Sequence, residues 1–219
     1  TGVLKDSAMD ILKKVIGVYS LEELSTALEL GYETILSEGI TTVHETGVGY
    51  FQSLLDEMAA YQNVQKKGKL KVRTRLYIRS RDMKKDMSML GIREGFGNDM
   101  LNIGGVKFFE DGAYSVHTAA FLKPYANAPD TCGSILYTKE ELKGLYEECH
   151  LNGLQTATHA IGDLAINEVL ECFEEIKAKY GWHDMRHRIE HFMVVNQDQM
   201  ERAKSCGLVI MSNASEIYF

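Results

Sequence analysis

The hydrophobic pattern of the chain alternates between two periods. Segments with apolar residues at helical spacing are separated by short β-branched runs that have the pattern of buried strands. The predicted strands are 40–43, 72–78, 103–109, 155–159, 188–192 and 208–212. The predicted helices are 20–37, 50–67, 83–90, 138–152, 163–180 and 197–206, with the weakest pattern over 83–90. This alternation predicts a parallel sheet with right-handed crossovers, in a single α/β domain over residues 1–219.

Local signals support this division. Ser20-Leu-Glu-Glu23 and Thr138-Lys-Glu-Glu141 have the pattern of capping boxes, which start helices. Between the third strand and the second capping box lies a long segment, 110–134, that contains both prolines of the chain. Loops of this length in compact domains are usually functional or mobile.

Periodicity does not distinguish an open doubly wound sheet from a barrel. A nucleotide-binding open sheet would carry G-x-G-x-x-G after its first strand, or a phosphate-binding loop of the Walker type. The sequence has neither, which weakens the interpretation of the chain as an open-sheet sugar or nucleotide binder.

Composition narrows the function classes further. A net charge of −7 and a pI near 5.5 argue against nucleic acid or an anionic membrane as a partner. The sequence contains no run of 18 apolar residues and no signal-peptide pattern, so we predict no membrane span. Its four cysteines are scattered without a C-x-x-C motif, which indicates reduced thiols and a cytoplasmic location.

Three polar residues at or near the ends of predicted strands are candidates for chemistry. His159 and His191 end successive strands, and Lys107 lies inside an apolar strand. Because the carboxyl ends of neighbouring parallel strands meet, the two imidazoles could converge on a transition metal. The alternatives are hydrogen-bonded structural histidines, and a Lys107 ammonium that pairs with Glu110 or Asp111.

Other polar residues have simpler interpretations. His44 follows the first strand and could line a pocket, Asp111-Gly112 could be a turn, and Asp163 is expected to be a helix N-cap. His187 precedes its strand and is expected at the opposite, structural end. Three histidines, in the long segment, on a helix and in a connector, are expected to be solvated or to make local contacts: His117, His150 and His183.

Four ordered motifs together resemble the amidohydrolase superfamily, and within it the amidohydrolase 3 branch of YtcJ-like metal-dependent hydrolases. They are Gly105-Val-Lys-Phe-Phe-Glu-Asp-Gly112, Thr118-Ala-Ala120 with Pro124-Tyr125-Ala126, His159-Ala-Ile-Gly-Asp163 and Arg186-His-Arg-Ile-Glu-His191. The amino-terminal Thr1-Gly-Val-Leu4 and the run Gly39-Ile-Thr-Thr-Val-His44 also fit that branch.

The resemblance implies a (β/α)8 TIM-type barrel with a small β-sandwich. The six predicted strands then correspond to barrel strands 2 to 7, and Lys107 matches a strand-4 lysine that is often carboxylated. His159 and His191 match the metal-binding histidines of strands 5 and 6. The chain has no His-x-His and ends before a strand-8 aspartate. We therefore expect an incomplete barrel, the middle portion of a longer enzyme without its sandwich domain.

The chemistry implied by the resemblance is hydrolysis of a non-peptide, amide-type C–N bond in a small molecule. One or two divalent ions, expected to be zinc, would bind Lys107, His159 and His191, the candidate catalytic residues. Three candidate substrate-binding residues are His44, Asp111 and His117, the last at a position where the family commonly has arginine. Because the general base and the outer ligands are missing, the isolated chain is expected to be inactive and need not retain metal.

A non-catalytic role is the rival hypothesis. An incomplete barrel could serve as a small-molecule-binding or self-assembling module, because unpaired sheet edges can pair with another copy of the chain. Metal content distinguishes the two hypotheses, since only the enzyme requires a bound ion.

Overall fold

The computed structural model describes residues 2, 4, 8, 10–13, 15–79, 87–181, 184–213 and 215. The elements, in chain order, are α1 (Asp10–Lys13), α2 (Leu21–Ser37), β1 (Thr42–Val48), α3 (Leu54–Lys66), β2 (Arg73–Arg79), the 3-10 turn η2 (Ser88–Leu90), β3 (Leu101–Phe109), the 3-10 turn η3 (Tyr114–Val116), α5 (Lys139–Leu151), β4 (Gln155–Ala160), α6 (Asp163–Tyr180), β5 (Arg188–His191), α7 (Gln197–Ser205) and β6 (Val209–Met211).

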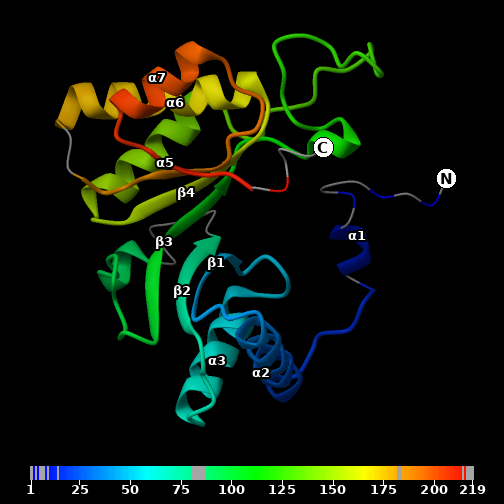
Figure 1. Cartoon of the computed structure of the whole chain (residues 1–219), viewed down its shortest axis with the longest axis vertical. Coiled ribbons are helices and arrows are strands. Elements are labelled where there is room, and N and C mark those ends of the chain that lie inside the picture. Colours follow the sequence, from blue (N-terminus) through cyan, green and yellow to red (C-terminus); the bar gives the residue numbers. More distant parts are fainter. Residues whose placement is uncertain are drawn as a thin grey trace.

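The strands form one parallel sheet in the order β1-β2-β3-β4-β5-β6. The sheet is curled: α2 and α3 lie beside its β1–β2 end, and α5, α6 and α7 cover the other end (Figure 1). Side chains meet across the inside of the curl, since Arg188 on β5 contacts His44 on β1 and Tyr77 on β2. The predicted α/β fold, an incomplete TIM-type barrel, is confirmed.

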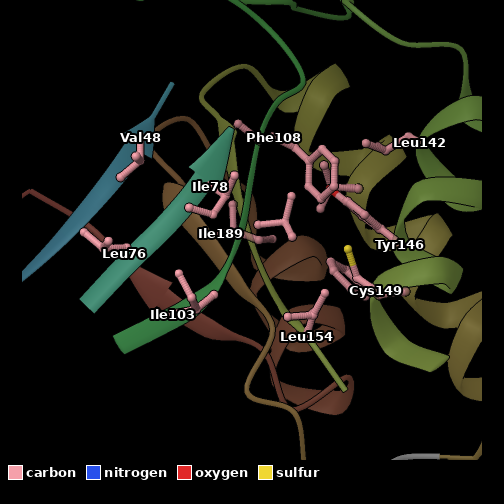
Figure 2. Close-up of a cluster of buried hydrophobic side chains, with 14 of the residues drawn as sticks. Val48, Leu76, Ile78, Ile103, Phe108, Leu142, Tyr146, Cys149, Leu154 and Ile189 are labelled. Carbon is pink, nitrogen blue, oxygen red and sulfur yellow. The ribbon is translucent and has the colours of Figure 1, made fainter. Parts of the chain in front are cut away.

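The core lies between the outer face of the sheet and the helices. Phe108 of β3 points toward Leu142 and Tyr146 of α5, and its ring centroid is 5.5 Å from that of Tyr146 (Figure 2). Phe108 is fully buried, and burying such a side chain contributes about 2 to 3 kcal/mol. Because strand residues alternate between faces, its neighbours Lys107 and Phe109 face the inside of the curl.

The helix starts follow local chemistry. Ser20 and Thr138 form the predicted capping boxes, and Asn196 forms a third that the sequence analysis did not identify. The predicted N-cap role of Asp163 is wrong, because Gly162 is the N-cap and Asp163 is the first helical residue. The Asp163 Oδ1 accepts a hydrogen bond of 2.8 Å from the backbone N–H of Leu122, so this side chain anchors the long segment.

Two predicted element bounds need correction. The first strand runs over Thr42–Val48, so His44 lies inside it, near its amino end, and not at its carboxyl end. Polar residues fit there because β1 is an edge strand of this sheet, and His44 and Glu45 are exposed. In the predicted helix 83–90, residues 83–86 lie outside the described residues, and Ser88–Leu90 form a 3-10 turn that ends at Gly91.

The cysteines and the hydropathy of the helices agree with the sequence analysis. All four thiols are free, and Cys149 and Cys172 are fully buried. In the parts of the chain described above, no helix combines the length and the apolar character that crossing a membrane requires.

Candidate active site

The three predicted ligands lie on adjacent strands. Lys107 is paired in register with Ala157, and His159, two residues further along β4, is paired with Phe109. His191 ends β5, the next strand. The ring centroids of His159 and His191 are 4.6 Å apart, with the planes at 70°. The fold therefore brings the two imidazoles together at the carboxyl end of the sheet.

The position of His191 depends on a break in strand geometry. Glu190 is paired in register with His159, so regular alternation would turn the next side chain to the other face. Instead, φ is +73° at His191 and +51° at Phe192, in the left-handed region that residues other than glycine rarely adopt. This turn places the His191 ring beside His159, while Phe192 packs into the core.

The His159 imidazole is held in the neutral form. Its Nε2 lies 2.9 Å from the carbonyl oxygen of Gly112 and 3.4 Å from Asp111 Oδ1. Burial lowers the His159 pKa to about 4, and the charges of His191 and Lys107 act in the same direction, against the hydrogen bond to Gly112. With the Nε2–H donating to Gly112, the lone pair lies on Nδ1. A neutral imidazole with an exposed lone pair is the form that ligates metals.

Lys107 is buried, and no carboxylate among the described residues forms an ion pair with it. It is 3% exposed, and its Nζ lies 4.7 Å from the ring centroid of Phe109. Burial lowers the Lys107 pKa to about 8, Glu190 opposes this effect, and Arg188 adds to it. Much more of this amine is therefore unprotonated near neutral pH than in an exposed lysine.

The alternative interpretation of Lys107, an ion pair with Glu110 or Asp111, is wrong for the described residues. The Glu110 side chain lies on the opposite face of β3, where burial and the neighbouring Glu168 raise its pKa to about 9. The Asp111 carboxylate instead accepts hydrogen bonds from the backbone N–H groups of Ala120, Ile161 and Gly162.

Asp111 therefore links the long segment to the β4–α6 turn. A Cβ at Gly162 would come within 1.9 Å of the Ala120 carbonyl oxygen, so only glycine permits this close approach. Asp111 is 1% exposed, and burial raises its pKa to about 6 against the effect of its backbone hydrogen bonds. Its predicted contact with substrate stays a prediction.

The other two predicted substrate-binding residues lie elsewhere. His44 contacts Arg188, with 2.7 Å between its Nδ1 and the arginine Nη1. His117 follows η3 in the left-handed conformation, with φ of +61°, and its ring centroid is 4.8 Å from that of Tyr125. The structure does not bring His44 or His117 into the His159–His191 pair, and their roles stay predictions.

Two histidines on the helix side of the sheet form a buried pair. His187 directly precedes β5, at the structural end where it is predicted. It is fully buried, and its Nδ1 lies 3.0 Å from the backbone nitrogen of Thr156. Its Nε2 lies 3.3 Å from Nδ1 of His150. The prediction that His150 is solvated or local is wrong, because this residue of α5 is 6% exposed and contacts His187, which precedes β5. His183 lies outside the described residues.

Comparison with known proteins assigns the chain to a protein family. The model of a family described as "Amidohydrolase family" matches residues 1–214. The chain belongs to the amidohydrolase family. The resemblance identified from the four sequence motifs is thereby confirmed.

Individual members support the assignment. YtcJ of Bacillus subtilis, named as an amidohydrolase, is 30% identical over 203 residues, 93% of this chain and 37% of that protein. An uncharacterized metal-dependent hydrolase from Pyrococcus furiosus has a TM-score of 0.82 at 28% identity, over 100% of this chain and 44% of that one. N-substituted formamide deformylase of Arthrobacter pascens is 26% identical over 114 residues, 52% of this chain and 20% of that protein. The chain thus spans less than half the length of these relatives.

Below the two histidines of this amidohydrolase lie buried polar residues that were not predicted from the sequence. Arg188 is 3% exposed and forms a two-pronged ion pair with Glu190, with 3.0 Å between Nη2 and Oε2. Its Nη1 donates to the hydroxyl of Tyr77 at 3.1 Å. The motif Arg-Ile-Glu-His carried the signal, because Arg188 and Glu190 have the period-2 spacing of one strand face.

The long segment of this amidohydrolase holds a cluster of aromatic rings. Tyr114, Phe121 and Tyr125 contact one another and line a cavity of about 680 Å³ together with Met193 and Val194. The lining residues follow β3 and β5, so the cavity lies at the carboxyl end of the sheet. A role of this segment in substrate selection stays a prediction.

The residues of the site fit part of a metal centre. In metal sites the second ring nitrogen of a ligating histidine usually donates to a carbonyl or carboxylate, as His159 Nε2 can donate to Gly112. His191 supplies a second imidazole, and Lys107 could ligate once its amine has lost its proton or has been carboxylated. Over the described ranges, no group of three or more His, Cys, Asp or Glu side chains has the spacing of a complete site.

Proposed function

We propose that this chain provides the β3–β5 part of the active site of a metal-dependent amidohydrolase that cleaves an amide-type C–N bond in a small molecule. The observation that carries the proposal is the 4.6 Å approach of the His159 and His191 rings next to the buried amine of Lys107. Membership in the amidohydrolase family supports hydrolysis, and the named activity of the Arthrobacter pascens relative supports a C–N bond.

The two histidines would hold a divalent ion, with zinc as the ion best matched to imidazole ligands. When bound, such an ion supplies Lewis acidity toward water and a carbonyl group. Burial keeps His159 neutral, and the Gly112 carbonyl orients its ring. The left-handed turn at His191 brings the second imidazole to the same point.

Lys107 would contribute through carboxylation. The lone pair of the neutral amine would attack CO2, so that an N–C bond forms, one N–H proton leaves to solvent and a carbamate anion results. Burial favours this step because it raises the fraction of neutral amine near pH 7. The product would replace a buried cation with an anion beside the histidines.

Calorimetric titration with zinc tests the proposal. We expect zinc binding by the unmodified chain, and a loss of affinity of at least about tenfold in His159→Ala and His191→Ala, because each removes a ligand. His187→Gln is the matched control, since it changes a buried histidine on the helix side of β5 and should retain zinc affinity. Equal zinc affinity in all four proteins would overturn the metal site. Because the isolated chain is expected to be inactive, amine release is assayed in the longer enzyme of which the chain is proposed to be a part, and release of no amine from N-acyl amides by that zinc-loaded enzyme would overturn the hydrolase assignment.

A further inference from the structure

Arg79 stands at the mouth of the curled sheet. It is the last residue of β2, and its register partner on β3 is Lys107. Register partners in a parallel sheet share a face, so Arg79 lies on the inner face, on the strand next to Lys107. It is half-buried, whereas Arg73 at the other end of β2 is exposed.

Two aromatic rings flank the Arg79 guanidinium. Its Cζ lies 4.7 Å from the ring centroid of Tyr50 and 5.6 Å from that of Phe109. The two rings are 5.8 Å apart. Contact with ring faces fixes the position of a guanidinium through cation–π attraction, and it leaves the N–H groups at the rim of the cation able to donate.

Arg79 differs from the other inner arginines in its partners. Arg75 forms an ion pair with Glu94, and Arg188 forms one with Glu190. Within the described ranges Arg79 forms no ion pair. A half-buried guanidinium that pairs with no carboxylate of the described residues, in a chain of net charge −7, is a position where an anion from outside can bind.

The flanking ring connects Arg79 to the candidate ligands. Phe109 contacts the Arg79 guanidinium, and its centroid also lies 4.7 Å from Lys107 Nζ and 5.4 Å from the ring centroid of His159. An anion bound by Arg79 would therefore lie about one ring away from the groups that would hold the metal.

We propose that Arg79 binds a carboxylate of the substrate, so that the enzyme acts on amides that carry a free carboxylate, such as N-acyl amino acids. The inference rests on the proposed function, and it adds the substrate class. A guanidinium binds a carboxylate through two parallel N–H···O bonds, which would orient the amide toward His159 and His191. Lysine cannot reproduce this geometry, because its ammonium is a single point charge.

A binding experiment tests the site without turnover. In ¹⁵N-labelled protein the Nε–H signal of Arg79 is assigned by its loss in Arg79→Met. The probes are N-acetylglycine and N-acetyl-L-phenylalanine, each compared with its neutral primary amide. We expect both acids to shift the Arg79 signal and both amides to leave it in place. If neither acid shifts this signal, the inference is overturned.

Kinetics give the second measurement, made on the longer zinc-loaded enzyme of which this chain is proposed to be a part, because the isolated chain is expected to be inactive. Hydrogen bonds to charged groups are worth about 1.5 to 3 kcal/mol, so Arg79→Met should reduce kcat/KM for the acids by about 10- to 150-fold, chiefly through KM. The neutral amides should change by less than about threefold, with Arg79→Lys intermediate for the acids. Arg73→Met, on the same strand, is the control and should match the unmodified protein.

The outcomes separate the two proposals. An equal loss for acids and amides in Arg79→Met would show that Arg79 acts on the lysine or metal and would overturn carboxylate recognition, while the hydrolase function would stand. A shift of the Arg79 signal by the acids, combined with hydrolysis of none of the probes by the longer enzyme, supports the anion site and counts against the proposed function.

Discussion

Arg188 on β5 reaches His44 on β1, four strands away in the sheet, with 2.7 Å between Nη1 and Nδ1. The same guanidinium binds Glu190 through two nitrogens and donates to the Tyr77 hydroxyl. It also lies 4.6 Å from the centroid of the Tyr77 ring. One buried cation thus ties the two ends of the curled sheet together beneath the candidate metal ligands.

Removal of this cation should strongly destabilise the fold. Arg188→Met leaves the Glu190 carboxylate buried without its partner, and a broken buried pair typically costs about 3 to 5 kcal/mol. Urea unfolding measures the loss. Arg202→Met, which breaks the more exposed pair with Glu174, should cost less than about 1 kcal/mol. The double variant Arg188→Met/Glu190→Leu should be more stable than Arg188→Met alone. No such recovery would show that the unpaired Glu190 carboxylate is not the cause of the destabilisation.

Stability should fall in mild acid because of His187. Burial, with a smaller contribution from His150, lowers the folded-state pKa of His187 to about 3, while the unfolded chain keeps the ordinary value of 6.5. Between these values the unfolded state binds more protons, so stability decreases as the pH falls below 6.5. The loss from this residue is about 2 kcal/mol between pH 6.5 and 5.

Urea midpoints measured from pH 7.5 to 5 check this dependence. His187→Gln should be less stable at pH 7.5 and should show a shallower decline toward pH 5, because the titrating group is gone. His117→Asn is the comparison variant and should keep the slope of the unmodified protein. A slope that is unchanged in His187→Gln would contradict the assignment.

The link made by Asp111 gives a sharper comparison. An asparagine at this position would direct an NH2 group at one of the three backbone N–H donors that the carboxylate now accepts, at a cost of about 1 to 3 kcal/mol. Asp163→Asn keeps the single Oδ1 acceptor for Leu122 and should cost little. Equal unfolding free energies for Asp111→Asn and Asp163→Asn would contradict the proposal that the Asp111 carboxylate links the long segment to the β4–α6 turn.

The sequence predicted elements well where a local signal determines them. The helix over 163–180 has the predicted bounds, because its apolar stripe is continuous and Gly181 follows it. The predicted first strand, 40–43, ends too early, because the polar residues His44 and Glu45 are typical of the end of a strand. An edge strand tolerates them, and β1 continues to Val48. The error concerns solvent exposure, which depends on the neighbours of a strand and not on its own residues.

The candidate site was predictable in its strands but not in its geometry. The order of Lys107, His159 and His191 follows from motif spacing alone. The turn that directs His191 inward has no such signal, because a left-handed backbone at histidine and phenylalanine is fixed by packing. The contact of Arg188 with His44 joins residues 144 positions apart. The burial of His150, on α5, depends on its contact with His187, which precedes β5. Both require the assembled fold.

Lys107 offers a direct test of whether a residue serves function at the expense of stability. Its buried amine lacks a carboxylate partner in the described part of the chain, and its pKa falls from 10.5 to about 8. The unfolded state therefore binds more protons between pH 8 and 10.5. The destabilisation, on the order of 3 kcal/mol, is fully present below pH 8 and is relieved as the pH rises toward 10.5.

Replacement of this lysine should separate stability from metal binding. Lys107→Met keeps the length of the side chain without the charge, so at pH 7 the metal-free protein should unfold at higher urea than the unmodified protein, while its zinc affinity falls. The exposed Lys71→Met should change neither quantity. If Lys107→Met instead lowers the unfolding free energy by more than about 1 kcal/mol, the amine has a stabilising partner in the folded state, and its burial no longer argues for a place at the metal.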